Sequence, residues 1–103
     1  VALHDPLTGC GNRLLMDERL NNQIARAKRN NEAFSLLSID LDDFKPVNDE
    51  YGHQTGDIVL KEVVARLQAS IRESDLLVRT GGDEFLIIFS SAVNADTICQ
   101  KLA

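Results

Sequence analysis

The sequence has few cysteines, no tryptophan, no long apolar run and no excess of basic residues. Its two cysteines, Cys10 and Cys99, are far apart, with no CxxC spacing and no histidine at ligand spacing. We therefore expect reduced thiols rather than a disulfide or a zinc site. No apolar stretch approaches the roughly 20 residues of a transmembrane helix. The first residues also lack the basic start of a signal peptide.

The balance of acidic and basic residues limits the classes of ligand that we expect this chain to bind. The chain carries 11 basic and 16 acidic residues, so its formal net charge at pH 7 is −5. This argues against DNA or RNA as a partner, because contact with a phosphate backbone needs a basic face. An acidic protein can still bind a polyphosphate when divalent cations bridge the two anions. With 44% hydrophobic and 26% charged residues, the composition is typical of one small globular domain.

Hydrophobic periodicity predicts a domain that mixes helices and strands. The continuous apolar run over 34–41 indicates a buried central strand, and Asn12 is expected to cap the first helix. A polar stretch over 42–55 leads from that strand to the second helix. The expected elements are a helix over 13–29, a strand over 34–41, a helix over 56–71, strands over 76–78 and 85–89, and a helix from 94.

The order of these elements predicts the fold. After the leading helix, the order strand, helix, strand, strand, helix is that of an α+β, ferredoxin-like or palm-like βαββα(β) unit whose last strand is missing from this chain. By analogy with that fold, a right-handed crossover places the third strand antiparallel beside the first. The C-terminal end of the first strand then lies at the same edge of the sheet as the tip of the hairpin over 76–89.

The hairpin tip is the strongest local candidate for a site. Gly81-Gly82 predicts a primed turn, which needs positive φ, and Asp83 and Glu84 follow at once. Such a tip is by itself more often only a turn, and an aspartate that ends a strand is often merely solvated. Asp40, however, ends the first strand and is expected to face Asp83. Two converging carboxylates suit Mg²⁺ together with substrate phosphates, so the pattern predicts metal–nucleotide chemistry.

Four motifs together identify a family. Residues 81–85 resemble the signature of GGDEF domains, the diguanylate cyclases. Residues 5–13 resemble its D-x-L-T-G-x-x-N-R motif, residues 40–57 its D-I-D-x-F-K-x-x-N-D-x-x-G-H-x-x-G-D motif, and residues 72–75 its R-x-x-D inhibitory site. Immediately before the signature this chain has Thr80, where the family often has an aromatic residue. The resemblance implies a single GGDEF domain over residues 1–103, truncated before the family's last strand and helix.

The resemblance also implies an activity. GGDEF enzymes condense two GTP molecules into cyclic di-GMP and pyrophosphate in a homodimer, where each 3′-hydroxyl attacks the other nucleotide's α-phosphate. The implied cofactor is Mg²⁺ or Mn²⁺, and cyclic di-GMP is both product and inhibitor. Upstream sensory or receiver domains are expected in a cytoplasmic parent protein, or in the cytosolic part of a membrane-anchored one. The alternative is a non-catalytic regulatory module that binds GTP or cyclic di-GMP, or an inactive fragment of a cyclase.

The resemblance assigns the catalytic and metal residues by position. Asp40, the backbone carbonyl of Leu41 and Asp83 would hold the metals. Glu84 would be either a further ligand or the group that activates the hydroxyl. Lys45 would meet the terminal phosphates as a point charge.

The resemblance also assigns the nucleotide-binding residues. Asn48 and Asp57 match the guanine-recognising positions, because an amide and a carboxylate can pair with the purine edge and reject adenine. Gly81 and Gly82 would let the backbone approach the nucleotide. Arg72 and Asp75 would bind cyclic di-GMP at the inhibitory site.

Structural alternatives stay open for several of these positions. Asp57 also falls in the first turn of the expected second helix, where a carboxylate favours the helix dipole. Arg72 and Asp75 can equally form a solvated ion pair worth under about 1 kcal/mol. His53 is expected to make a structural hydrogen bond. Arg79 is a candidate contributor to the inhibitory surface or to that of a partner.

Overall fold

The structure, a computed structural model, describes residues 2–41 and 44–91. At residues 44, 45, 47 and 48 it describes the backbone alone. The expected helix from Asn94, and Cys99 within it, lie outside the described residues. None of the helices in the described ranges is long and apolar enough to cross a membrane. The elements are α1 (Arg13–Asn30), β1 (Ser35–Asp40), α2 (Phe44–Tyr51), α3 (His53–Ser70), β2 (Leu76–Arg79) and β3 (Glu84–Phe89).

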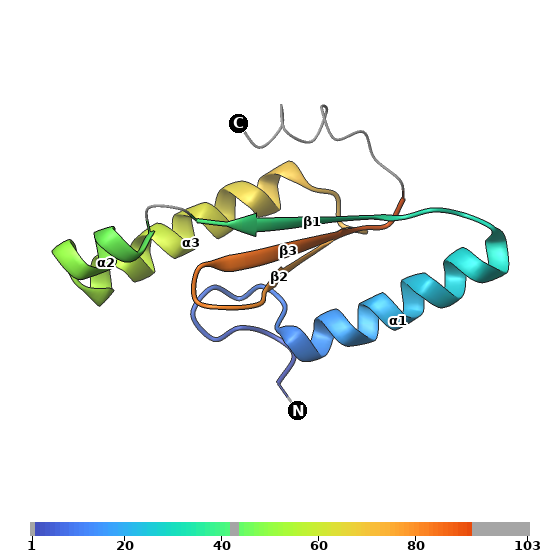
Figure 1. The fold of residues 1–103 in the computed structure, drawn as a ribbon, viewed down its shortest axis with the longest axis horizontal. Helices are drawn as coiled ribbons and strands as arrows, with labels where there is room; N and C mark the ends of the chain where they lie inside the picture. The colour runs from blue at the N-terminus through green and yellow to red at the C-terminus, as the bar shows by residue number, and fades with distance from the viewer. Residues whose placement is uncertain (1, 42–43, 92–103) are drawn as a thin grey trace.

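The strands form one antiparallel sheet in the order β1-β3-β2 (Figure 1). This confirms the expected α+β architecture, in which the third strand lies antiparallel beside the first. In the β1–β3 register, Ser35 is opposite Phe89 and Asp40 is opposite Glu84. The pairing therefore brings the end of β1 to the start of β3, directly beside the loop that joins β2 to β3.

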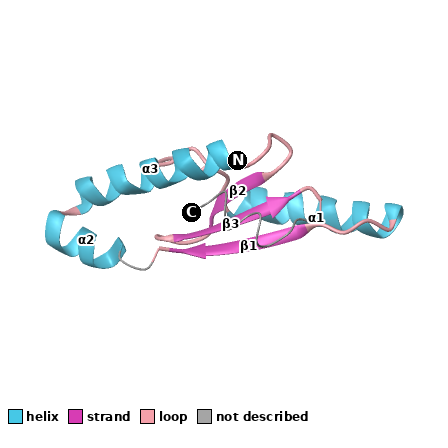
Figure 2. Cartoon of the chain, turned by 90° about the horizontal axis from the view of Figure 1, so that it is seen from above, coloured by secondary structure: helices cyan, strands magenta, loops and turns pink. Residues whose placement is uncertain are grey.

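The core lies between the sheet and α3, which runs along one face (Figure 2). The helical spacing of Leu60, Val63, Val64, Leu67 and Ile71 predicts one apolar stripe for this helix. Leu60, Val64 and Leu67 are buried, and Val63 and Ile71 are partly buried against the same core. Each fully buried large apolar side chain contributes roughly 1.5–3 kcal/mol relative to exposure. The buried residues of the main cluster are Cys10, Leu60, Val64, Leu67, Leu77, Phe85, Ile87 and Phe89.

The expectation that the strand over 34–41 is buried and central is wrong for the described sheet. There β1 pairs only with β3, and exposed and half-buried residues alternate along it, with Leu36 49% exposed. The central strand is β3, where Ile87 and Ile88 are both fully buried although they face opposite sides of the sheet. A run of apolar residues indicates burial, but it cannot tell which of two such runs lies in the middle.

The connection over 42–55 contains a helix that periodicity did not predict. Its residues favour helix weakly, and Pro46 is tolerated because it lies in the first turn of α2, where backbone N–H groups have no intrahelical partner. Gly52 follows with φ of 90°, a conformation that a residue with a side chain rarely adopts, and it separates α2 from α3. As a result α3 begins at His53, three residues before the predicted start, and Asp57 lies beyond its first turn.

Helix α1 has the predicted start but not the predicted buried face. Asn12 has an extended backbone, and its side-chain Oδ1 accepts from the Leu15 N–H at 3.0 Å, which confirms the N-cap. Asn31 ends the helix in the left-handed conformation. The spacing of Met16, Leu20, Ile24 and Ala27 predicts one apolar stripe. The prediction is wrong at Ile24, which is 43% exposed, whereas Gln23 is buried.

Replacing the cap tests its contribution. We expect Asn12→Ala to lower the free energy of unfolding by about 0.5–2 kcal/mol, because the Leu15 N–H loses its acceptor. Asn22→Ala, on the exposed part of the same helix, is the matched control and should have no destabilising effect, since alanine favours helix more than asparagine does. Urea denaturation followed by circular dichroism measures both. Equal effects of the two changes would contradict the capping role.

Candidate functional site

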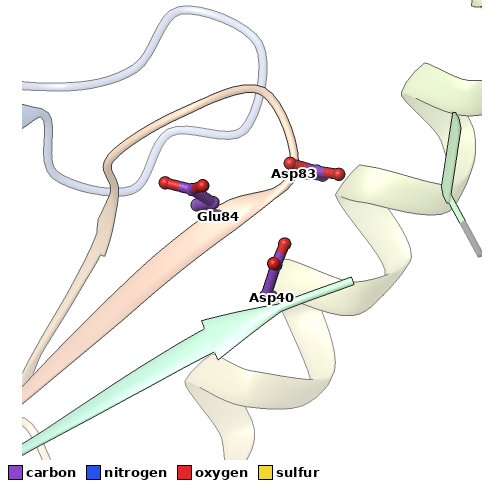
Figure 3. A group of neighbouring side chains, drawn as sticks. All are labelled: Asp40, Asp83 and Glu84. Atoms are coloured by element: carbon purple, nitrogen blue, oxygen red, sulfur yellow. The ribbon is translucent and has the colours of Figure 1, made fainter. Parts of the chain in front are cut away.

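Three acidic side chains meet at the edge of the sheet where β1 ends (Figure 3). Asp40, Asp83 and Glu84 each offer one carboxylate oxygen, and these oxygens lie within 4.8 Å of one another. The β1–β3 pairing positions them, because Asp40 is opposite Glu84 and the Leu41 N–H donates to the Asp83 carbonyl at 3.1 Å. The structure therefore brings together residues that lie more than 40 positions apart in the sequence.

The chemistry of this acidic cluster suits a hard divalent cation. Asp40 and Glu84 are exposed and Asp83 is half-buried, so the cluster is open to a ligand that arrives from solvent. Its donors are all carboxylate oxygens, and Mg²⁺ is typically held by one or two carboxylates together with substrate phosphates. The described part of the chain thus fits the cation that the motifs imply.

The loop between β2 and β3 is not the primed turn that the diglycine predicted. It comprises the four residues 80–83, and neither Gly81 nor Gly82 has a positive φ. Their lack of side chains serves the surroundings instead. A Cβ at Gly81 would lie 3.2 Å from a carboxylate oxygen of Glu84, and a Cβ at Gly82 would project into open space. Glycine therefore leaves room for an acid of the cluster and keeps the Gly82 backbone accessible.

The diglycine loop is also held by contacts with the N-terminal segment of the chain, which lies beside it (Figure 1). Arg79 donates to the Gly81 and Gly82 carbonyls at 3.2 and 2.9 Å, and its Nη1 forms an ion pair with Asp5 at 3.3 Å. Arg13 donates to the Thr80 carbonyl at 2.9 Å. Arg79 thus has partners within the chain, and its contribution to an inhibitory surface stays a prediction. Sequence reasoning missed these contacts because an arginine near a loop gives no sign of its partner.

Hydrogen bonds within the N-terminal turn hold the Asp5 side chain in place. Its carboxylate accepts from the Thr8 N–H at 2.9 Å and the Thr8 hydroxyl at 2.7 Å. Partial burial by itself raises the pKa of Asp5, but the hydrogen bonds from Thr8 and the charge of Arg79 outweigh it, so the pKa is lowered. The carboxylate therefore stays ionised, and the ion pair persists, until the pH falls below the ordinary aspartate value of about 3.9.

Cys10 closes the same turn and is buried in the core. Burial raises the pKa of its thiol, and the nearby negative charge of Asp5 adds to the effect, although the hydrogen bond with Thr8 opposes it. The thiol is free, as expected for this cysteine, and protonated at neutral pH. Its position in the core indicates a packing role.

Within the described residues, Arg72 and Asp75 of the R-x-x-D segment do not form an ion pair with each other. Asp75 accepts from the Arg72 backbone N–H at 2.9 Å and from the Ser90 N–H at 3.0 Å, so its carboxylate joins the loop after α3 to the end of β3. The Arg72 side chain is exposed and forms no ion pair within the described residues. Arg72 is thus available to a ligand, whereas Asp75 also has a structural role.

The remaining predicted site residues lie on α2, on α3 and directly after β1. Lys45 and Asn48 belong to α2, but their side chains lie outside the described part of the structure. Asp57 is half-buried in α3. The role of the Leu41 carbonyl stays a prediction, although the residue lies directly beside the acidic cluster.

Comparisons with known proteins identify the family. A family model described as "Diguanylate cyclase, GGDEF domain" matches residues 2–102. The bifunctional diguanylate cyclase/cyclic di-GMP phosphodiesterase MucR of Pseudomonas aeruginosa is 46% identical over 104 residues, which cover 99% of this chain and 15% of MucR. The diguanylate cyclase DgcS of Shewanella oneidensis is 43% identical over 102 residues, covering 98% of this chain and 34% of DgcS. The chain therefore belongs to the GGDEF domain family of diguanylate cyclases.

Solved structures agree with this assignment. The diguanylate cyclase SiaD from Pseudomonas aeruginosa, solved with its activator SiaC, superposes with a TM-score of 0.90 at 37% identity over 98% of this chain and 40% of SiaD. The coiled coil and GGDEF domain of DgcB from Caulobacter crescentus, solved with cyclic di-GMP, superposes with a TM-score of 0.88 at 32% identity over 97% of this chain and 52% of that one. The chain thus spans only part of the proteins it matches.

Proposed function

We propose that this domain forms half of the active site of a diguanylate cyclase, which joins two GTP molecules into cyclic di-GMP and releases two pyrophosphates. The observation that supports the proposal is the convergence of Asp40, Asp83 and Glu84 at one edge of the sheet. Phosphoryl-transfer chemistry needs neutralised phosphate charge and in-line positioning more than it needs covalent catalysis. An open cluster of carboxylates at a strand end can hold the divalent cations that would meet both requirements.

Asp40, Asp83, Glu84 and the Leu41 carbonyl are the proposed ligands of Mg²⁺ or Mn²⁺. A cation bound there would neutralise phosphate charge and acidify the attacking 3′-hydroxyl. Glu84 is exposed at the start of β3, a position open to either of two roles: a further ligand, or the acceptor of the hydroxyl proton. The ordered pairing of β1 with β3 holds the carboxylates before any ligand arrives, which lowers the reorganisation needed during the reaction.

The nucleotide contacts are proposed for residues on α2 and α3. Lys45 would donate to the terminal phosphates, and Asn48 and Asp57 would recognise guanine. A carboxylate accepts from the N1–H and N2–H₂ groups of guanine, whereas adenine lacks these donors. A site built for these hydrogen bonds would leave its own polar groups unpaired with ATP, which is the basis of the expected preference for GTP.

A homodimer follows from the symmetry of the product. Cyclic di-GMP contains two identical phosphodiester links, so two identical half-sites that face each other can form both by the same chemistry. Each chain would supply one acidic cluster and one bound GTP. If the site binds nucleotide without catalysing the reaction, the domain would be a regulatory module that binds GTP or cyclic di-GMP.

Product formation distinguishes the two roles. Because the chain spans only part of its relatives, the assay uses the full-length protein that carries it, incubated with GTP and Mg²⁺ and analysed by chromatography. Cyclic di-GMP and pyrophosphate in a one-to-two ratio are expected, with no cyclic product from ATP. Nucleotide binding without any product would reject the catalytic proposal in favour of the regulatory module.

Arg72 is the cleanest probe of product inhibition. We expect Arg72→Ala to raise the half-inhibitory concentration of cyclic di-GMP at least about tenfold, since a hydrogen bond to a charged group contributes roughly 1.5–3 kcal/mol. The uninhibited rate should not change, because the side chain has no partner within the described residues. Rates measured against added cyclic di-GMP test this. An unchanged half-inhibitory concentration would remove the inhibitory role of Arg72. Asp75→Ala is a poorer probe, because it also removes hydrogen bonds to Arg72 and Ser90.

A further inference from the structure

The diglycine loop has three consecutive carbonyls bound by arginine side chains. Arg13 Nε donates to the Thr80 carbonyl at 2.9 Å. Arg79 Nε donates to the Gly81 carbonyl at 3.2 Å and to the Gly82 carbonyl at 3.3 Å, and Arg79 Nη2 donates to the Gly82 carbonyl at 2.9 Å. The carbonyl groups of this loop are therefore bound by Arg13 of α1 and by Arg79 of β2, and Arg79 is in turn paired with Asp5 of the N-terminal turn.

The opposite face of the same peptides carries backbone N–H groups. In a trans peptide the C=O and the following N–H point in opposite directions. When the Gly81 and Gly82 carbonyls face Arg79, the N–H groups of Gly82 and Asp83 point away from it. Neither N–H has a hydrogen-bond partner among the described residues. The second of these donors belongs to Asp83, which is itself a member of the acidic cluster.

The guanidinium group of Arg79 is held by several partners at once. All three of its guanidinium nitrogens are engaged, and Nη1 lies 3.3 Å from each carboxylate oxygen of Asp5. The Arg79 and Asp5 side chains are 18% and 16% exposed, so solvent competes weakly for the pair. Two hydrogen bonds from Thr8 fix Asp5 in turn. The planar guanidinium thus has one orientation in which it can serve Asp5 and both glycine carbonyls.

From these contacts we propose that Arg79, anchored by Asp5, is a positioning residue for the reaction. It orients the diglycine peptides so that the N–H groups of Gly82 and Asp83 donate to a phosphate group of the nucleotide bound at the acidic cluster. Successive backbone N–H groups that point the same way are an established means of binding anions. The inference rests on the proposed nucleotide chemistry and adds to it an oriented pair of backbone donors.

The kinetic test replaces Arg79 by lysine in the full-length protein. Lysine keeps the charge, but one ammonium cannot reach Asp5 and both carbonyls in the same geometry. We expect Arg79→Lys to lower kcat about 10- to 100-fold with KM for GTP within about threefold, because the contact aligns the reacting phosphate. Asp5→Asn, which leaves Arg79 without its anchor, should lower kcat in the same direction. Arg66→Lys, at an exposed ion pair on α3, is the matched control and should leave kcat unchanged.

A second readout does not depend on turnover. In the ¹⁵N-labelled chain, the amide signals of Gly82 and Asp83 should shift when 3′-deoxy-GTP, which lacks the attacking hydroxyl, is added with Mg²⁺. In Arg79→Lys these shifts should be lost, while the melting temperature and the affinity of the acidic cluster for Mn²⁺ stay close to the original values. A purely structural role predicts a lower melting temperature with unchanged kcat per folded molecule, and that result would overturn the inference.

The proposed active site and the positioning role of Arg79 can be rejected separately. An Asp83→Asn protein that still makes cyclic di-GMP would reject the proposed site itself. An inactive Asp83→Asn protein beside an Arg79→Lys protein with unchanged kcat and unchanged amide shifts would reject the positioning role alone.

Discussion

Asp83→Asn is expected to abolish cyclic di-GMP formation, lowering kcat by at least about 10³-fold. The change keeps the size of the side chain but removes one of the converging negative charges. Charge stabilisation by a bound cation contributes several kcal/mol to such reactions, and each 1.36 kcal/mol is a factor of ten in rate. Chromatography of the nucleotide products measures the loss of activity. Titration with Mn²⁺ measures the expected loss of cation affinity.

Asp17→Asn is the matched control for this prediction. Asp17 lies on the exposed face of α1, so the substitution makes the same chemical change away from the acidic cluster. It should leave both kcat and Mn²⁺ affinity unchanged. Full activity in Asp83→Asn, or an equal loss in both variants, would mean that the acidic cluster does not hold the catalytic cation.

Leu77→Ala is expected to remove a large share of the protein's folding stability. Leu77 is fully buried in β2, and a buried leucine replaced by alanine costs about 2–5 kcal/mol because a cavity is left behind. A domain of this size has only about 5–15 kcal/mol of stability in total. Thermal and urea denaturation should show the loss, together with a lower yield of folded protein.

Leu36→Ala provides the comparison within the same sheet. Leu36 lies on β1 and is 49% exposed, so the same truncation removes far less buried surface. We expect its cost to stay below about 1 kcal/mol. Similar losses for both leucines would mean that the core does not lie between α3 and the sheet face that carries Leu77.

Much of the candidate site could be predicted from the sequence because its residues follow strand ends. Asp40 ends an apolar run and Asp83 precedes another, so an antiparallel pairing of those runs brings the two acids together. The structure confirms this convergence and adds Glu84 to it. The support of the diglycine loop could not be predicted, because Asp5 and Arg79 are 74 positions apart and no periodic pattern relates them.

The errors in the predicted fold share one physical origin. Periodicity reports which residues are apolar, whereas the position of a strand within a sheet depends on its neighbours. For this reason the apolar run over 34–41 predicts a central strand, although β3 takes that position in the described sheet. The sequence does not predict the short helix α2, because a polar segment with a proline carries little helical signal and tertiary packing overrides weak local preference.

The sequence by itself determined the family, the order of most elements and the identity of the acids, because motif residues and strand-length apolar runs are local properties of the chain. Only the tertiary structure decided which strand is central in the described sheet and what surrounds the two glycines of the loop over 80–83. It also showed that Asp5, Arg13 and Arg79 support that loop. These features depend on the meeting of distant backbone and side-chain groups, such as the Arg79 guanidinium and the Asp5 carboxylate. The diglycine is therefore explained by Glu84 beside Gly81 and the open backbone of Gly82, rather than by the conformational freedom of glycine.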